Sequence, residues 1–226
     1  MKKCVVLSGA GISADSGLRT FRDAGGLWEG HRVEDVCTPE AFERNPALVL
    51  DFYNQRRRQA NAAQPNPAHL ALAGLETHYR VHIITQNVDD LHERAGSSRV
   101  LHLHGELNKV RSSRDVRPWT GDLTLCDTDR NGYLMRPHIV WFGESVPLFE
   151  TAVEEMQDAD VVLVVGTSLQ VYPAASLLGF APAHADIYLV DPQRPPHLPA
   201  HIEVITAAAK DGVPELAARL RQQAGG

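Results

Sequence analysis

The sequence predicts an α/β fold in which helices cover a parallel β-sheet and a smaller module is inserted. Short apolar runs rich in Val and Ile recur along the 226 residues, and segments of helical length separate several of them. Such alternation is typical of a parallel sheet with helices on both faces. The first run leads into a glycine-rich turn at residues 9–11. A strand that enters such a turn indicates a Rossmann-like parallel sheet domain with a smaller inserted module.

The expected elements follow from these runs and from helix signals. Asn66 followed by Pro67 predicts a helix start, because Asn caps the first turn and Pro fits the first helical position. Helices are also expected at 147–157, 173–178 and 213–222. The expected strands are residues 5–7, 81–84, 100–103, 139–142, 161–165, 187–190 and 202–205.

Two stretches depart from the alternation of strands and helices. Residues 25–63 are charged and helical in pattern after Pro46, whereas residues 106–136 are polar and have no clear period. We expect these stretches to form the small module together, as a helical part and a ribbon. The Rossmann-like domain is then expected to comprise residues 1–24, 64–105 and 137–226.

Composition argues against several classes of protein. The 22 Lys and Arg against 28 Asp and Glu give a net charge of -6, which disfavours a nucleic-acid partner. The three cysteines are far apart and odd in number, which suits a reducing cytoplasm. The apolar run at residues 4–7 is too short for a secretory signal, and no segment is long enough to span a membrane. We expect a cytoplasmic monomer without membrane contact.

The glycine turn suggests a nucleotide site. Gly9, Gly11 and Ala14 match the Gly-x-Gly-x-x-Gly/Ala pattern, whose glycines let backbone amides approach a pyrophosphate. On the glycines alone, a tight turn without a ligand is equally consistent. A dehydrogenase would place an acidic residue about 20 positions later, at the end of a second strand. That region is not strand-like here, and the turn runs instead into polar residues and an aromatic one, which points away from hydride transfer.

Five motifs follow one another along the chain: GAGISADSGLRTFR (9–22), TQNVDDLHERAG (85–96), HLHGEL (102–107), VWFGE (140–144) and GTSLQVYPAA (166–175). Together they closely resemble the sirtuins, the NAD-dependent protein-lysine deacylases, and specifically a bacterial member. The likeness covers nearly the whole chain. It implies that NAD is consumed as a co-substrate, that acyl-lysine proteins are the partners, and that nicotinamide and O-acyl-ADP-ribose are released.

The resemblance also implies a set of cofactor-binding residues. It places the phosphates at Gly9, Ala10 and Gly11 on one side and at Gly166, Thr167 and Ser168 on the other. Asp191 takes the position at the adenosine ribose, and Gln86, Asn87 and Asp89 line the nicotinamide pocket, although Asn and Asp also favour plain turns. The set is completed by Ser13, Asp15, Phe21, Arg22 and Ala209.

His104 is the residue that the resemblance favours as the catalytic base, with Asn87 beside it. Imidazole suits proton removal from a ribose hydroxyl near neutral pH. His102 lies two residues earlier, on the same strand face if the strand is regular, so a metal-dependent hydrolase with a further ligand from residues 90–93 is an alternative. That alternative explains neither the glycine turn nor VWFGE. A third class, a non-catalytic ADP-ribose or NAD sensor, does not need His104.

The peptide site is expected where sirtuins add their substrate as an extra strand, between residues 140–144 and residues 169–172. The residues implied are Val140, Phe142, Gly143, Glu144 and Val171. A buried strand is the alternative for Ile139 and Val140.

One part of the family pattern is missing. Sirtuins commonly place two Cys-x-x-Cys pairs around a structural zinc, and here the corresponding positions are SSRD (112–115) and CDTD (126–129). One thiol, two carboxylates and a hydroxyl make a poor zinc site. We expect no zinc and a small module held by packing around Trp119, Tyr133 and Leu134.

The acyl group is the last inference. Tyr53 and Arg56 are three residues apart, so on a helix they share one face. From the residues alone, Arg56, Arg57 and Arg58 can be a solvated patch with Tyr53 packed in the module. The resemblance extends to the sirtuin subgroup that removes succinyl and malonyl groups, whose marker is a Tyr and an Arg at this spacing. In that subgroup a small residue, here Cys37 rather than the usual Ala, leaves room for the acyl chain. The resemblance implies a dual enzyme that removes succinyl or malonyl groups and also acetyl groups.

Overall fold

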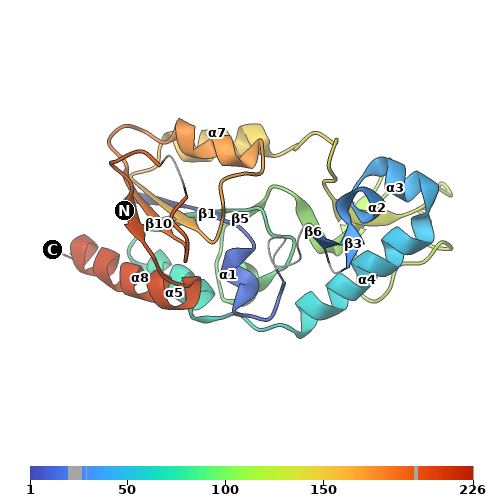
Figure 1. The fold of residues 1–226 in the computed structure, drawn as a ribbon, viewed down its shortest axis with the longest axis horizontal. Coiled ribbons are helices and arrows are strands. Elements are labelled where there is room, and N and C mark those ends of the chain that lie inside the picture. The colour runs from blue at the N-terminus through green and yellow to red at the C-terminus, as the bar shows by residue number, and fades with distance from the viewer. Residues whose placement is uncertain (20–26, 29, 196–197, 226) are drawn as a thin grey trace.

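The computed structural model describes residues 1–19, 27–28, 30–195 and 198–225. Its centre is a six-stranded parallel sheet, shown edge-on in the middle of Figure 1. The strand order is β11-β10-β9-β1-β4-β5. The strands are β1 (Lys3–Ser8), β4 (Arg80–Thr85), β5 (Val100–His102), β9 (Val161–Val165), β10 (Asp186–Val190) and β11 (Glu203–Ile205).

Helices cover both faces of this sheet. Alternate residues of β1 point to opposite faces, so Cys4 and Val6 pack in one core cluster and Val5 and Leu7 in another. The first cluster is closed by α5 (Pro67–Gly74) and α8 (Ala209–Gly225), and the second by α7 (Phe149–Gln157) and the 3-10 helix η2 (Ala174–Phe180). Figure 1 shows α5 and α8 below the sheet and α7 above it. Burial on both faces explains why the strands are continuous apolar runs.

The register brings the carboxyl ends of the central strands to one edge. Ser8 is paired with both Thr85 and Val165, and Thr85 is paired with His102. The short helices that follow β1 and β4 start at this edge: α1 (Gly11–Ala14) and α6 (Leu91–Arg94). The loops that leave it therefore lie side by side.

The small module contains an antiparallel sheet of order β7-β6-β8 and the helices beside it, on the right of Figure 1. Its strands are β6 (Gly105–Arg111), β7 (Val116–Pro118) and β8 (Arg136–Ile139), with a short hairpin of β2 (Leu27–Trp28) and β3 (His31–Arg32). Its helices are α2 (Val33–Val36), α3 (Pro39–Arg44) and α4 (Pro46–Ala62), and the turn η1 (Leu75–Thr77) lies in the sheet domain. The predicted helix after Pro46 is confirmed.

Several predicted elements are wrong in detail. The run at 139–142 is not a parallel strand: β8 pairs antiparallel with β6 and ends at Ile139, while Trp141 is buried and Phe142 is exposed. The segment at 173–178 forms a 3-10 helix, and the last helix begins at Ala209, before the predicted 213. An apolar run predicts that its side chains are buried, but it does not predict which sheet the segment belongs to.

The predicted packing of the small module is also partly wrong. One of its buried clusters consists of Leu50, Val110, Leu123 and Met135, and Trp119 packs against it as expected. Tyr133 is instead exposed, with the guanidinium of Arg114 over its ring, and Leu134 is only half-buried. These residues precede β8, and Met135 takes the buried position in their place.

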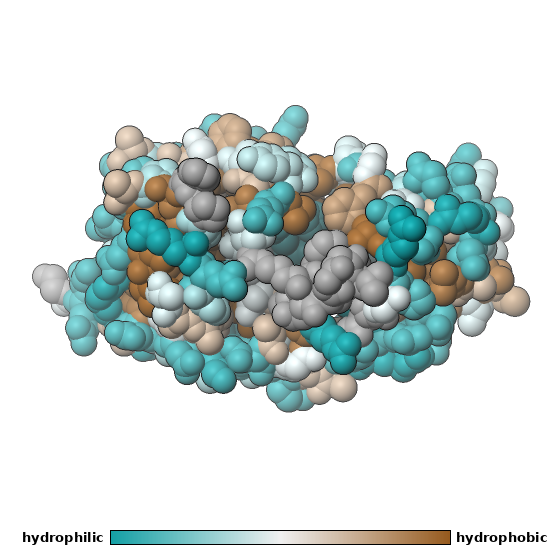
Figure 2. Space-filling model, in the orientation of Figure 1, coloured by the Kyte–Doolittle hydropathy of each residue, from teal (hydrophilic) through white to brown (hydrophobic). Residues whose placement is uncertain are grey.

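The face shown in Figure 2 is mostly hydrophilic and is interrupted by hydrophobic patches. Within the described part of the chain, no helix is both long enough and apolar enough to cross a bilayer.

Candidate active site

The glycine turn after β1 packs directly against the turn after β9. The Gly9 N–H donates to the Val165 carbonyl over 3.0 Å, and the Gly11 N–H donates to the Gly166 carbonyl over 2.8 Å. A Cβ on Gly11 would lie 2.7 Å from the Gly166 Cα, and one on Gly166 would lie 2.3 Å from the Ile12 nitrogen. Side chains cannot be accommodated at these two positions, so the turns form a cradle of bare backbone.

Polar side chains from the β4 edge close one end of this cradle. Asn87 Nδ2 donates to Ser13 Oγ over 3.1 Å, and Ser13 Oγ donates to Asp89 Oδ2 over 3.2 Å. Gln86 Nε2 donates to Thr167 Oγ1 over 3.1 Å, which links the ends of β4 and β9. The structure thus brings together five residues that the sequence analysis singled out. Burial raises the pKa of Asp89, whose other oxygen accepts the Leu91 N–H, so the turn-capping alternative also holds for this residue.

His104 lies in the turn between β5 and β6, beside the cradle. Its Nδ1 donates to the Gln86 carbonyl over 3.1 Å, so the proton is on Nδ1 and Nε2 carries a lone pair. Burial lowers the pKa of His104 below its ordinary value, which keeps the ring neutral at neutral pH. The next residue, Gly105, has a φ of 83°, and a Cβ there would lie 1.9 Å from the His138 carbonyl oxygen. Glycine is therefore required for the turn that presents His104.

His102 does not share a face with His104, contrary to the regular-strand expectation. The strand β5 ends at His102, whose Nδ1 donates to the Asn87 carbonyl over 3.0 Å. Its Nε2 lies 2.7 Å from Glu93 Oε1. Both ring nitrogens are thus engaged, and no group of three His, Cys, Asp or Glu among the described residues could hold a metal ion. These contacts disfavour the metal-hydrolase alternative.

The next residues are those predicted for the adenosine end of the cofactor site. Asp191 follows β10 and is buried, and its Oδ1 accepts the Gln193 N–H over 2.9 Å. Ser168 is half-buried after the cradle, and Ala209 is buried at the start of α8. The predicted Phe21 and Arg22 lie outside the described residues.

The predicted acyl pocket is formed by α4 and the segment before α3. Tyr53 is fully buried, and its hydroxyl donates to Cys37 Sγ over 3.2 Å and accepts from Trp141 Nε1 over 3.0 Å. Arg56 is half-buried, with its guanidinium 5.9 Å from the centre of the Phe52 ring. Its charge lowers the pKa of both Cys37 and Tyr53, although burial, the larger effect, raises both. Tyr53 thus contacts Cys37 directly and the charge of Arg56 acts on both, and the acyl pocket itself stays a prediction.

The three consecutive arginines of α4 have three different environments. Arg57 is buried, and its Nε donates to the Leu107 carbonyl over 2.7 Å while Nη1 donates to Asn54 Oδ1 over 2.9 Å. Arg58 is exposed and forms an ion pair with Asp122. Only Arg58 fits the alternative of a solvated patch.

The segment at 140–144, part of the predicted peptide site, is hydrogen-bonded to the turn that carries His104 and to Cys37. The Val140 N–H donates to the His104 carbonyl, and the Phe142 N–H donates to the Cys37 carbonyl. Phe142 and Val171 are 49% and 38% exposed, so their side chains remain open to a partner. Gly143 has a φ of 89°, which favours glycine at this bend.

The side chain of Glu144 is bound by arginines that the sequence analysis missed. Its carboxylate accepts from Arg111 over 2.9 Å, from Arg136 over 2.8 Å and from the Trp141 N–H over 2.8 Å. Arg136 also stacks on Trp141, with its guanidinium 3.7 Å from the ring centre. These bonds position Glu144 within the segment, and its contact with substrate stays a prediction.

Comparison with known proteins decides the family. The sequence model of the Sir2 family matches residues 9–173. The chain belongs to the Sir2 family. A relative from Helicobacter pylori (strain ATCC 700392 / 26695), named NAD-dependent protein deacylase, is 54% identical over 228 residues, which cover 99% of this chain and 100% of the relative. One of the same name from Aggregatibacter actinomycetemcomitans is 62% identical over 192 residues, which cover 84% of this chain and 92% of the relative.

A solved structure supports the same assignment. The structure of a Sir2 homologue in complex with NAD superposes on this Sir2-family chain with a TM-score of 0.90 at 40% identity. The match covers 99% of this chain and 91% of the other. The predicted α/β class, a Rossmann-like parallel sheet with a small additional module, is confirmed.

In this Sir2-family chain, residues 112–115 and 126–129 stand where sirtuins commonly have zinc-binding cysteines, and hydrogen bonds link these two positions. Asp129 Oδ2 accepts from Ser112 Oγ over 2.7 Å, and its Oδ1 accepts the N–H groups of Asn131 and Tyr133. The Ser112 hydrogen bond, above all, lowers the pKa of Asp129. Cys126 is exposed.

Asp15 has a partner that no local pattern indicates. Its carboxylate forms an ion pair with Lys210 Nζ over 3.3 Å, at the start of α8. The predicted cofactor residue therefore also ties the glycine turn to the last helix.

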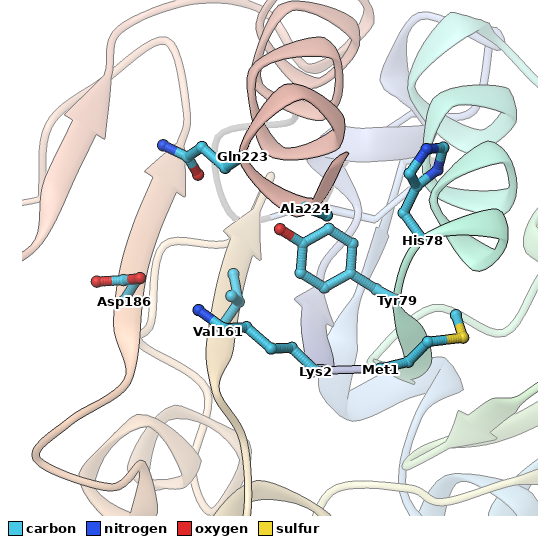
Figure 3. Close-up of a pocket in the computed structure, with 8 residues that line it drawn as sticks. All are labelled: Met1, Lys2, His78, Tyr79, Val161, Asp186, Gln223 and Ala224. Atoms are coloured by element: carbon cyan, nitrogen blue, oxygen red, sulfur yellow. The ribbon is translucent and has the colours of Figure 1, made fainter. Parts of the chain in front are cut away.

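A cavity of about 270 Å³ lies at the opposite edge of the sheet and is shown in Figure 3. Lys2, Tyr79, Val161 and Asp186 line it, at the amino ends of β1, β4, β9 and β10. None of the predicted site residues lies there.

Proposed function

We propose that this Sir2-family protein is an NAD-dependent protein-lysine deacylase that removes acetyl, succinyl and malonyl groups and releases nicotinamide and O-acyl-ADP-ribose. The observation that carries the proposal is the position of His104. Its Nδ1 is tied to the Gln86 carbonyl at the rim of the Gly9–Gly166 cradle, so its basic Nε2 is left for a substrate proton. A neutral imidazole in that state suits general base catalysis.

The cradle fits the cofactor in the proposed function. Residues 9–11 and 166–168 would hold the pyrophosphate at the junction of the two turns, where the absence of side chains lets the turns approach closely, and the Thr167 and Ser168 hydroxyls would donate to it. Asp191 and Ala209 would lie along the adenosine, with Ser13 and Asp15 behind the turn. Phe21 and Arg22 remain predicted cofactor residues.

The reaction requires two tasks of these residues, orientation of the carboxamide and removal of a proton. NAD, when bound, supplies the anomeric carbon that the acyl oxygen attacks as nicotinamide leaves. Gln86, Asn87 and Asp89 would orient the carboxamide with their amide and carboxylate groups. Asn87 and Asp89 are already hydrogen-bonded to Ser13, and Gln86 to Thr167. His104 would then take a proton from a ribose hydroxyl at Nε2.

The substrate side rests on the exposed segments. Phe142 and Val171 would flank an acyl-lysine peptide that adds as a strand between 140–144 and 169–172. Arg56 would bind the distal carboxylate of a succinyl or malonyl group through a charge-assisted pair of hydrogen bonds. We further propose that the enzyme is a cytoplasmic monomer that holds no zinc and binds neither nucleic acid nor membrane, with the small module at residues 25–63 and 106–136.

Incubation with NAD and acetylated or succinylated peptides, followed by mass spectrometry, tests the proposal. We expect nicotinamide release that depends on acyl-lysine. His104→Ala should lower turnover by about a thousandfold, within the usual range for a lost general base, while NAD affinity changes little. His184→Ala, at an exposed position, is the matched control. Deacylation without NAD would favour a metal hydrolase, and NAD binding without turnover would favour a sensor.

A further inference from the structure

Two histidines separated by one residue hold two consecutive backbone carbonyls. His104 Nδ1 donates to the Gln86 carbonyl over 3.1 Å, and His102 Nδ1 donates to the Asn87 carbonyl over 3.0 Å. The backbone N–H groups of the same two residues are also hydrogen-bonded. The Gln86 N–H donates to the Ser8 carbonyl, and the Asn87 N–H donates to Thr85 Oγ1. The whole peptide segment that carries Gln86 and Asn87 is therefore fixed from both sides.

The second nitrogen of His102 has a charged partner. Its Nε2 lies 2.7 Å from Glu93 Oε1, and the side chains of His102 and Glu93 are 6% and 41% exposed. His102 thus faces two acceptors, a carbonyl and a carboxylate. A neutral imidazole has one N–H and an imidazolium has two, so only the charged ring satisfies both acceptors.

The surroundings of His102 favour that charge. Burial opposes it, yet the hydrogen bond and the charge of Glu93 raise the pKa of His102 above its ordinary value. The pKa of Glu93 is correspondingly lowered despite burial, through the same hydrogen bond. Glu106 adds negative charge from β6, and Asp89 adds it from the loop before α6. The remaining neighbour, His92 of α6, is kept neutral by its burial, which lowers its pKa well below the ordinary value.

We propose that His102 is a positioning residue for deacylation: as an imidazolium between Glu93 and the Asn87 carbonyl, it fixes the segment that lines the nicotinamide pocket. The inference rests on the proposed function, which assigns Gln86 and Asn87 to that pocket. Deprotonation leaves one N–H for two acceptors, so a ring lone pair then faces an oxygen and one of the two contacts is lost. The Asn87 side chain, bonded to Ser13, moves with its backbone.

The two histidines then limit the reaction on opposite sides of the ordinary histidine pKa. His104 must be neutral to act as a base, and its lowered pKa places the acid limb of the rate profile below the ordinary histidine value. His102 must be charged, and its raised pKa places an alkaline limb above that value. The profile of kcat/KM for NAD should therefore be bell-shaped.

Three variants test this assignment through the pH dependence of kcat/KM for NAD. Glu93→Gln offers an amide donor to Nε2, so a neutral His102 satisfies both contacts. We expect a loss of about threefold near neutral pH and no alkaline limb. His102→Leu removes both contacts, and we expect a loss of about tenfold or more with the acid limb unchanged. Glu155→Gln alters another histidine–carboxylate pair, with His82 of β4, and should keep the wild-type profile. An alkaline limb that survives in Glu93→Gln, or His102→Leu activity within about twofold of wild type, would overturn the proposal.

Nitrogen NMR of the histidine rings gives a readout without turnover. At neutral pH we expect His102 to carry protons on both nitrogens and His104 on one, with signals assigned by His102→Gln and His104→Gln. If His102 is neutral in an active enzyme, this inference is wrong and the proposed function still stands. A charged His102 in a protein that releases no nicotinamide would sink the proposed function instead.

Discussion

The hydroxyl of Tyr53 donates a hydrogen bond to Cys37 Sγ over 3.2 Å while it accepts one from Trp141 Nε1 over 3.0 Å. Burial raises the pKa of Tyr53 well above its ordinary value, so the phenol stays neutral and has a single proton to give. That proton is committed to the thiol. In the proposed function, the carboxylate of a succinyl group that binds Arg56 must therefore compete with Cys37 for the Tyr53 hydroxyl proton.

Replacing Cys37 with Ala should release that hydroxyl. We expect kcat/KM for succinyl-lysine peptides to rise about fivefold, the equivalent of one net hydrogen bond, and acetyl-lysine turnover to change by less than about twofold. Steady-state kinetics on paired peptides measures both. Cys126→Ala, at an exposed position, is the control. Equal gains on both substrates would mean that Cys37 affects room in the pocket and not the tyrosine proton.

Replacing Arg56 with Met should separate the two acyl classes. We expect the KM for succinyl-lysine to rise about tenfold or more, because the carboxylate loses a charged partner as it is desolvated, with much less effect on acetyl-lysine. Arg58→Met is a control on the same helix, since Arg58 is exposed and pairs with Asp122. Losses of equal size on both substrates, or equal effects of the two variants, would place Arg56 outside the acyl pocket.

The parallel sheet could be predicted because its strands are buried on both faces. The strand β9, VVLVV, is apolar at every position, and a run of this kind has few other uses. The run at 139–142 looked equivalent, yet Trp141 packs in the small module and Phe142 is on the surface. The composition of a short apolar run does not distinguish a strand of the parallel sheet from a segment that is buried in the small module. The surface against which the run packs is formed by residues far away in the sequence.

The same limit applies to the site. The glycine turn and His104 could be identified from local motifs, whereas the partners that hold them could not. Glu144 is bound by Arg111, which lies 33 positions away, and Asp15 by Lys210. No local pattern encodes such pairs, and only the fold brings them together.

The ribbon should be stable without metal. We expect no stoichiometric zinc after dialysis and unchanged activity in a strong chelator, because Asp129 organises the ribbon through the hydrogen bonds from Ser112, Asn131 and Tyr133. Asp129→Ala should lower the melting temperature by a few degrees. Asp115→Ala, which removes only a surface ion pair with Arg117, is the comparison. Metal analysis that finds one tightly bound zinc per chain would contradict the expectation.

Acid should destabilise the protein through a buried pair of histidines. His69 and His92 are almost fully buried, with ring centres 5.0 Å apart beneath the glycine turn, and His92 Nε2 is bonded to Ser8 Oγ over 2.9 Å. Burial lowers the pKa of His69 to about 4 and that of His92 well below its ordinary value. The unfolded chain binds these protons near the ordinary value of 6.5. Stability from the neutral rings is therefore complete above that pH and is lost as the pH falls from there towards the folded-state pKa.

The loss should be about 1.4 kcal/mol per pH unit for each histidine in that window. His69 Nδ1 accepts the Asn66 N–H at the start of α5, and Gln at this position can keep that capping bond without titrating. Urea unfolding of wild type and His69→Gln between about pH 5 and pH 7 measures the difference. We expect the slope of His69→Gln to be smaller than that of wild type by about 1.4 kcal/mol per pH unit, and the slope of His184→Gln, at an exposed position, to match wild type. A His69→Gln slope equal to that of wild type would show that His69 does not enter the folded core as a neutral ring.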